Sequence, residues 1–148
     1  MKQYEELARV GSKYHKDKNF CGVIALAVAT NIKFTKAQGL LRKYGRIKKK
    51  GTPFQAFWNS LRDLGFVNVS VWHNTDYDED KEPMPKTIDT CLRKLPKKGT
   101  FWILTNRHIT CVKDGVMEDW AAKGSRKRVI WVAQILPLHY SADQVFKP

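Results

Sequence analysis

Apolar residues in the first half of the chain recur at the spacing of helices. Residues 1–10 carry a short apolar stripe, whereas residues 11–20 are polar and basic and are expected to form a loop. Residues 21–29 are apolar on every side, which predicts a helix buried in the core. Asn31 is placed to end this helix.

Two further helices follow in the pattern. Thr35 is a good N-cap for a helix over residues 36–44 that ends at Gly45. Thr52 and Pro53 form another start signal, with Thr as the cap and Pro in the first turn. Large apolar residues then fall at helical spacing until Gly65, namely Phe54, Phe57, Trp58, Leu61 and Leu64.

From residue 66 onward the pattern changes to the alternation of strands. FVNVSVW predicts a first strand over residues 66–72, and residues 86–95 predict a short helix. Four more strand-like runs follow: TFWILTN, HITCVKD, GVMEDW and VIWVAQIL. Helices first and an antiparallel sheet after them predict an α+β fold. We expect one domain over residues 1–148, with a helical part at about 1–65 and a sheet part at about 66–140.

Composition argues against several classes of protein. With 43% hydrophobic and 11% aromatic residues the chain is not expected to be disordered. Its longest apolar run, residues 21–30, is too short to span a bilayer, and its charged start is unlike a secretory signal. Three cysteines without paired spacing indicate free thiols in a reducing compartment. We therefore expect a cytoplasmic protein without a membrane association.

The charge balance is strongly positive, with 27 Lys and Arg against 14 Asp and Glu and a net charge of +13. Such a field favours polyanions such as nucleic acid, although a basic surface can also serve solubility alone. The candidate polyanion-binding residues are Arg42, Lys43, Arg46, Lys48, Lys49, Lys50, Lys123, Arg126, Lys127 and Arg128. An acidic run at 76–82 lacks the glycine and the spaced glutamate of an EF-hand calcium loop, so we expect a solvated loop there.

Cys21 stands at the start of the buried helix, where the chemistry of a thiol changes. A thiol attacks only as the thiolate, which the positive end of a helix dipole or a nearby His stabilises. Asn19 or Asp17 could cap the helix and leave Cys21 in its first turn. Taken alone, a free Cys is as readily a small buried apolar residue.

A predicted hairpin supplies partners for this thiol. Asp114-Gly115 is a strong two-residue turn signal, and a turn there pairs Thr110 with Asp119. His108 and Asp119 then lie diagonally on one face, within reach of a hydrogen bond. A one-residue slip would put Glu118 in the place of Asp119. A Cys, a His and a carboxylate together are the groups that a cysteine nucleophile needs.

A metal site is not expected from this sequence. On a strand His108 and Cys111 point to opposite faces, the chain has no CxxC pair, and structural zinc needs four converging ligands. His15, His73 and His139 have no partners at motif spacing and are expected at the surface. We expect no cofactor.

These residues make the chain resemble the papain-like cysteine peptidase superfamily, and more closely the small C39-peptidase-like proteins of tailed phages. The resemblance is carried by FCGVIALAVATNIKFTKAQGLLRKYGR, by KKKGTP after it and by GTFWILTNRHITCVKDGVMED, and it covers much of residues 19–120. It implies a papain-like fold, in which N-terminal helices carry the nucleophile at a helix start and pack on a C-terminal antiparallel sheet. By matching position it implies Cys21 as the nucleophile, His108 as the base and Asp119 as the group that orients the His.

One position departs from the family pattern. About six residues before the Cys the family usually has a Gln that helps to hold the oxyanion, and this chain has His15 there. His15 or Asn19 is the candidate donor in its place, with the backbone N–H of Cys21 as the other donor.

The sequence therefore leads to two hypotheses. The first is a thiol hydrolase that cleaves a peptide or isopeptide bond, with deamidation or acyl transfer open to the same residues. Its substrate would be a protein or peptide, with acidic ones favoured by the positive charge, and a phage-encoded enzyme would act in the host cytoplasm. The second is a non-catalytic basic protein on the same scaffold that binds nucleic acid or an acidic host protein.

Overall fold

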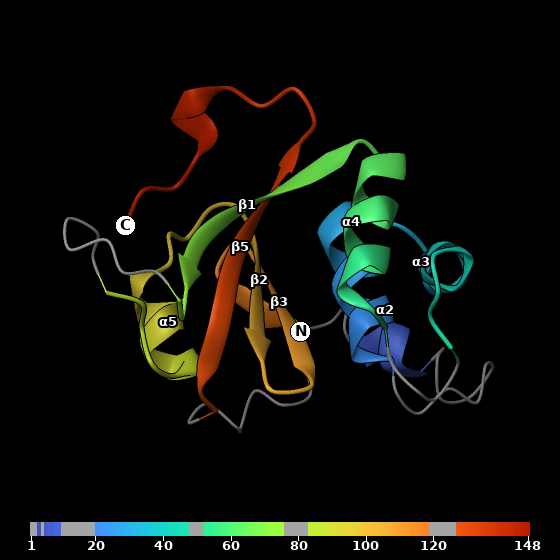
Figure 1. Cartoon of the computed structure of the whole chain (residues 1–148), viewed down its shortest axis with the longest axis horizontal. Coiled ribbons are helices and arrows are strands. Elements are labelled where there is room, and N and C mark those ends of the chain that lie inside the picture. Colours follow the sequence, from blue (N-terminus) through green and yellow to red (C-terminus); the bar gives the residue numbers. More distant parts are fainter. Residues whose placement is uncertain (1–2, 4, 10–19, 48–51, 76–82, 119–126) are drawn as a thin grey trace.

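A five-stranded antiparallel sheet runs through the middle of the molecule, with helices against both of its faces (Figure 1). The computed structural model describes residues 3, 5–9, 20–47, 52–75, 83–118 and 127–148. These residues confirm the α+β class expected from the sequence. None of the helices in the described ranges combines the length and the apolar character needed to span a bilayer.

The helices occur where the sequence predicts them. Residues 3 and 5–9 are helical. The later helices are α2 (Cys21–Thr30), α3 (Phe34–Lys43), α4 (Phe54–Asp63) and α5 (Ile88–Lys94), and a 3₁₀ turn, η2 (Ala142–Gln144), lies near the C-terminus. The acidic run at 76–82 and the expected loop at 11–19 lie outside the described residues.

All the strands expected from the alternation are present. They are β1 (Phe66–His73), β2 (Thr100–Thr105), β3 (His108–Lys113), β4 (Val116–Glu118) and β5 (Val129–Pro137). Their order in the sheet is β1-β5-β2-β3-β4, and every neighbouring pair is antiparallel. The last strand of the chain therefore lies between the first two.

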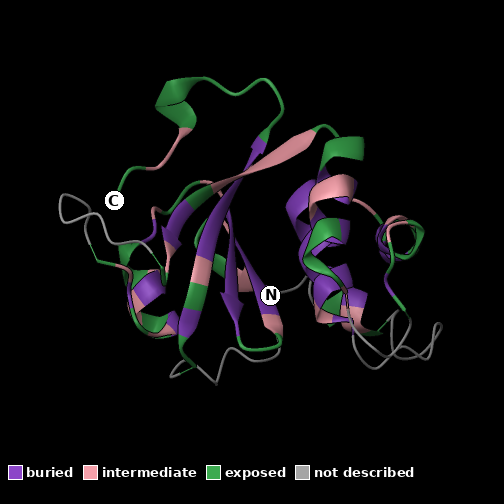
Figure 2. Ribbon diagram, in the orientation of Figure 1, coloured by how far each residue is buried: buried purple, intermediate pink, exposed green. Residues whose placement is uncertain are grey.

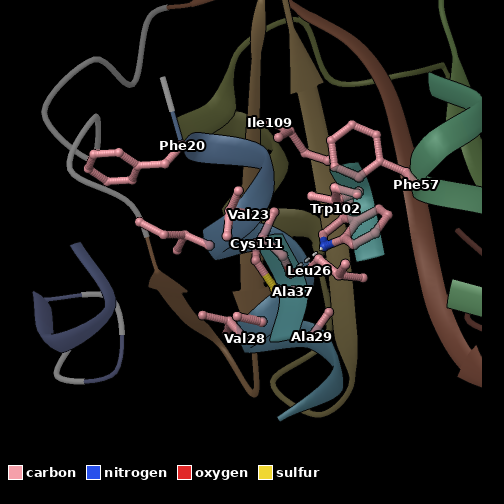
Figure 3. Close-up of a cluster of buried hydrophobic side chains, with 14 of the residues drawn as sticks. Phe20, Val23, Leu26, Val28, Ala29, Ala37, Phe57, Trp102, Ile109 and Cys111 are labelled. Atoms are coloured by element: carbon pink, nitrogen blue, oxygen red, sulfur yellow. Dashed lines mark hydrogen bonds between the residues drawn. The ribbon is translucent and has the colours of Figure 1, made fainter. Parts of the chain in front are cut away.

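Helix α2 forms the centre of the helical side of the sheet. Every residue of α2 after its first is buried, as the predicted all-round apolar surface requires (Figure 2). The helix lies between β3 on one side and α3 on the other. Trp102, Ile109 and Cys111 of the sheet face it, alongside Val23 and Leu26 of the helix itself (Figure 3).

Two hydrogen bonds tie α2 to the sheet beneath it. The indole Nε1 of Trp102 donates to the carbonyl oxygen of Ala25 at 3.1 Å, inside the core (Figure 3). The Nζ of Lys113 donates to the carbonyl oxygen of Val28 at 3.0 Å. The indole of Trp102 is a buried donor, and losing its partner would cost about 1–3 kcal/mol, so this bond above all opposes sliding of the helix along its axis.

The opposite face of the sheet is covered by α5 and the C-terminal segment. Strand alternation directs a second set of side chains to this face, where Ile88 and Cys91 of α5 and Phe146 meet them. The sheet residues of this cluster include Val71, Trp72, Phe101, Ile103, Val112, Val129 and Val132. The sheet is thus buried on both faces and lies between two apolar clusters.

The start of α2 differs from the sequence prediction. Phe20 is the N-cap, and no side chain caps the helix, where Asn19 or Asp17 was expected to do so. The Phe20 ring is buried and meets the ring of Phe34 edge-on, with 6.0 Å between ring centroids. Apolar packing of the cap residue thus fixes the entry of the chain into α2.

Two other helices also start at a different residue from the one expected. Helix α3 begins at Phe34, so Thr35 lies in its first turn instead of capping it. Pro53 precedes α4 as its N-cap, one residue later than the expected Thr52. The helix ends agree with expectation, because Asn31 and Gly45 both adopt left-handed conformations.

Gly22 lets α4 approach the start of α2, which a larger residue would prevent. A Cβ at this position would lie 2.6 Å from the Cζ of Phe57 and 3.2 Å from the Oγ1 of Thr52. We expect Gly22→Ala to lower the free energy of unfolding by about 1–3 kcal/mol, because the aromatic ring has to move within a packed core. Denaturant unfolding followed by circular dichroism measures this.

Gly39 in α3 is the matched control for this prediction. A Cβ there would meet nothing within 4 Å, so Gly39→Ala should raise the free energy of unfolding by about 0.5–1 kcal/mol through helix propensity. If the two substitutions changed the free energy of unfolding by the same amount in the same direction, the explanation by packing at Gly22 would be wrong.

Candidate active site

Cys21 opens α2 and is the one residue of that helix that is not buried. The hydrogen-bond ladder of the helix begins with the N–H of Ile24, which donates to the carbonyl oxygen of Phe20 at 3.0 Å. Cys21 therefore lies in the first turn, as the sequence predicts. Backbone N–H groups and the positive end of the helix dipole gather there, and both stabilise a thiolate.

The other two cysteines are in a different environment. Cys91 in α5 and Cys111 in β3 are buried, and all three cysteines are free thiols. Burial raises the pKa of the Cys91 thiol and that of the Cys111 thiol, each to about 12. Neither thiol can supply a thiolate near neutral pH, so Cys21 is the candidate nucleophile.

His108 opens β3 directly after a tight hairpin. Strands β2 and β3 are joined by Asn106 and Arg107, and the strand pairing sets Thr105 opposite His108. Arg107 has a left-handed backbone with φ 58°, and His108 itself is half-buried. The imidazole is therefore carried on the end of the central hairpin of the sheet.

Cys21 and His108 line the same cavity, which has a volume of about 580 Å³. The start of α2, the start of α4 and the β2–β3 hairpin meet around it. Its lining residues are Cys21, Gly22, Thr52, Phe54, Phe57, Leu104, Thr105, Arg107, His108 and Ile109. Alternation along β2 and β3 puts these hairpin residues on both faces of the sheet, so the cavity wraps around the hairpin end. The thiol and the imidazole, far apart in the sequence, are brought to one space.

The second hairpin has the register that the sequence predicts. Asp114 and Gly115 form the turn with positive φ angles of 50° and 81°, and the pairing sets Cys111 opposite Glu118. Cys111 faces α2, so Glu118 belongs to that face and cannot take the place of Asp119 through a slip of register. Asp119 itself lies outside the described residues.

Several other predicted site residues also lie outside the described part of the chain. They are the oxyanion candidates His15 and Asn19 and the cations Lys48, Lys49, Lys50, Lys123 and Arg126. Their roles stay predictions.

The described polyanion candidates are divided between two sides of the sheet. Arg42 and Lys43 are exposed at the end of α3, whereas Lys127 and Arg128 are exposed beside the start of α5, across the sheet (Figure 1). Arg46 is only 2% exposed, so it belongs to the interior and is not available to a surface ligand.

Lys43 is engaged with its neighbours at the end of α3. Its Nζ lies 3.5 Å from Oδ2 of Asp63, which also accepts a hydrogen bond of 2.6 Å from the hydroxyl of Tyr44. The hydrogen bond from Tyr44 is the largest of the causes that lower the pKa of Asp63. This carboxylate offsets part of the positive charge at this end of the molecule.

Of the residues that line the cavity, sequence reasoning predicted Cys21 and His108 as site residues but gave no such role to others, among them Thr52, Phe54, Thr105 and Arg107. Phe54 is 59% exposed although it lies at the apolar spacing of α4, and its ring stacks on Trp58 with 6.4 Å between centroids. The signal for Arg107 was its place between two predicted strands, next to His108. Thr52 and Phe54 were recognised only as the start of a helix, and a helix start does not predict which part of the fold its residues will face.

No group of three or more His, Cys, Asp and Glu side chains within the described ranges is arranged to hold a metal ion. Of the histidines expected at the surface, His139 is exposed, while His73 is half-buried with its ring 5.8 Å from that of Trp131. No family model, curated protein or solved structure matches the chain.

The two buried thiols make stability depend on pH. Unfolded thiols ionise at a pKa near 8.5, whereas Cys91 and Cys111 in the folded protein keep their protons up to about pH 12. The unfolded state then binds fewer protons between these values, so the free energy of unfolding falls as pH rises from about 9 toward 12. Urea unfolding at a series of pH values measures the slope, which is at most about 1.4 kcal/mol per pH unit for each thiol.

Cys91→Ala isolates the contribution of one thiol. The variant is less stable at neutral pH because of the lost packing, but its stability should fall less steeply with pH than that of the unaltered protein. If the stability of the two proteins fell equally steeply with pH, Cys91 would have the same pKa in the folded and the unfolded state, and the prediction would be wrong.

Proposed function

We propose that this protein is a thiol hydrolase of papain-like type that cleaves a peptide or isopeptide bond. The observation that carries the proposal is the cavity shared by Cys21, at a helix start, and His108, at a strand start. A nucleophile and a base on one accessible cavity are the first requirement for acyl transfer. Support also comes from the burial of the other two cysteines, which leaves Cys21 as the thiol that a substrate can reach.

In the first half of the reaction His108 accepts the proton of the Cys21 thiol. The sulfur attacks the carbonyl carbon of the substrate, so that a C–S bond forms and the carbonyl oxygen becomes an oxyanion. The backbone N–H of Cys21, in the first turn of α2, is a donor for this charge, with His15 or Asn19 as the second. Collapse of the intermediate breaks the C–N bond, and the protonated His108 gives its proton to the departing amine.

In the second half water replaces the amine. His108 removes a proton from the water as its oxygen attacks the thioester carbon. The C–S bond then breaks, the carboxylic acid leaves, and the sulfur recovers its proton from His108. In this scheme Asp119 accepts a hydrogen bond from the imidazole and fixes its orientation, so that one ring nitrogen faces the sulfur.

The wall of the cavity is suited to a polypeptide substrate. Phe54 and Phe57 from α4 line the cavity together with the hairpin residues Leu104 and Ile109. Apolar and aromatic walls with a few polar groups are typical of sites that bind organic ligands. The outward Phe54 ring offers a surface for a side chain next to the bond that is cleaved.

The pH dependence of alkylation tests the pairing of Cys21 with His108 without any knowledge of the substrate. We expect iodoacetamide to modify Cys21 at pH 6 at a rate close to that at pH 8, because the imidazolium holds the thiolate at the lower pH. In His108→Gln the rate at pH 6 should fall at least about tenfold, toward the titration of an ordinary thiol. Mass spectrometry of the peptide that contains Cys21 gives the rates.

Activity itself is measured with a library of fluorogenic peptidyl amides. Cys21→Ala should abolish cleavage, whereas Cys91→Ala should retain it, because that thiol is buried in the opposite cluster. Full cleavage by Cys21→Ala, or an ordinary thiol titration of Cys21 in the unaltered protein, would refute the proposal.

A second candidate function, polyanion binding, is favoured by the cations around α5. Lys127 and Arg128 are exposed, and the carbonyl oxygen of Lys127 accepts a hydrogen bond from the N–H of Ile88 at the start of that helix. Arg93 at the other end of α5 is exposed as well. Binding through such a surface would weaken steeply with salt and would survive the Cys21→Ala substitution.

A further inference from the structure

We propose that the cavity selects an anionic substrate, with Arg107 binding a carboxylate close to the carbonyl group that Cys21 attacks. The carboxylate would be an acidic side chain beside the cleaved bond or the free carboxyl terminus of a peptide. This inference rests on the proposed hydrolase and names the substrate class of the same site.

The charge of the cavity wall favours an anionic ligand. Among the lining residues that lie in the described part of the chain, Arg107 is the one with a permanent charge, and none of these residues is an Asp or a Glu. In the part of the chain that the structure describes, no carboxylate lies within ion-pair distance of Arg107. The guanidinium is exposed and therefore accessible to an anion from outside. A carboxylate bound there replaces water and meets no competing negative charge from the described wall.

The backbone of Arg107 adopts an unfavourable conformation at the rim of the cavity. Its φ of 58° lies in the left-handed region, where a residue other than Gly or Asn costs about 1–2 kcal/mol. Arg107 lies in the turn of the hairpin directly before His108, where it is exposed and lines the cavity. An Arg held at this cost, on the rim of the cavity, is consistent with selection for its side chain.

The chemistry of the guanidinium defines the ligand. Its planar donors match the two oxygens of a carboxylate and bind them with two parallel hydrogen bonds, a geometry that Lys cannot reproduce. Because Arg107 adjoins His108, a carboxylate on Arg107 would be close to the reacting carbonyl rather than at a remote part of the substrate. The expected substrates are thus peptides that are acidic at, or next to, the cleaved bond.

Two alkylating reagents that differ in charge test this inference. Iodoacetate and iodoacetamide both transfer a two-carbon group to a thiolate with loss of iodide, but only iodoacetate carries a carboxylate. The ratio of their second-order rates at Cys21, at pH 7 and low salt, reports the preference for an anion and cancels changes in the reactivity of the thiol. We expect Arg107→Gln to lower this ratio roughly fivefold. Arg107→Lys should lower it by an intermediate factor, because Lys keeps the positive charge but loses the two parallel hydrogen bonds.

Arg62→Gln is the matched control because it removes the same charge elsewhere. Arg62 is exposed in the last turn of α4, about 12 Å along the helix from Phe54 at the rim of the cavity. The Arg62→Gln substitution should leave the ratio within about 1.5-fold of that of the unaltered protein, since it changes only the long-range electrostatic field, which salt screens. Circular dichroism of each variant confirms that it is folded.

The outcomes separate this inference from the proposed function. An unchanged ratio in Arg107→Gln, or an equal fall in Arg62→Gln, overturns the role of Arg107. The iodoacetamide rate at pH 6 and its loss in His108→Gln would stand in either case, and with them the hydrolase. A fall confined to Arg107→Gln supports carboxylate recognition.

Discussion

The docking of α2 on the sheet is the constraint on which the candidate site depends. A helix that is apolar on every side is stable only when it is covered on every side, and β3 and α3 supply that cover. Within the interface the indole of Trp102 bonds to the carbonyl of Ala25, so the helix cannot slide without leaving a buried donor unpaired. Its first residue, Cys21, is thereby held at one position relative to the β2–β3 hairpin.

The same packing separates the three thiols by reactivity. Cys91 and Cys111 lie inside the two apolar clusters, where burial raises the pKa of each to about 12. Cys21 lies where the helical core ends and the cavity begins, and Phe57, which packs over Gly22, lines the cavity together with both residues. One apolar helix with a thiol at its end therefore leaves a single cysteine thiol accessible, without any further device.

Features set by neighbouring residues could be predicted from the sequence, whereas features set by packing could not. The Asp114-Gly115 turn fixes its own register, and the pairing of Cys111 with Glu118 follows from it. The cap of α2 was not predictable, because burial of Phe20 against Phe34 replaces the polar cap that local rules favour. The cavity is also set by packing and could not be predicted. Three separate segments form it, and their convergence depends on the tertiary fold rather than on any local motif.

In the proposed reaction, positive charge acts both on the thiolate of Cys21 and on the anionic substrate. The dipole of α2 and an imidazolium at His108 would stabilise the thiolate of Cys21, and Arg107 on the same wall would stabilise it further. A thiolate surrounded by cations becomes less nucleophilic as it becomes more stable, so too much charge slows its attack. A carboxylate bound to Arg107 neutralises the cation while the acidic substrate is in place and returns nucleophilicity to the sulfur. An anionic substrate would in this way both dock beside the nucleophile and activate it, whereas a neutral substrate would leave the thiolate in its more stable and less reactive state.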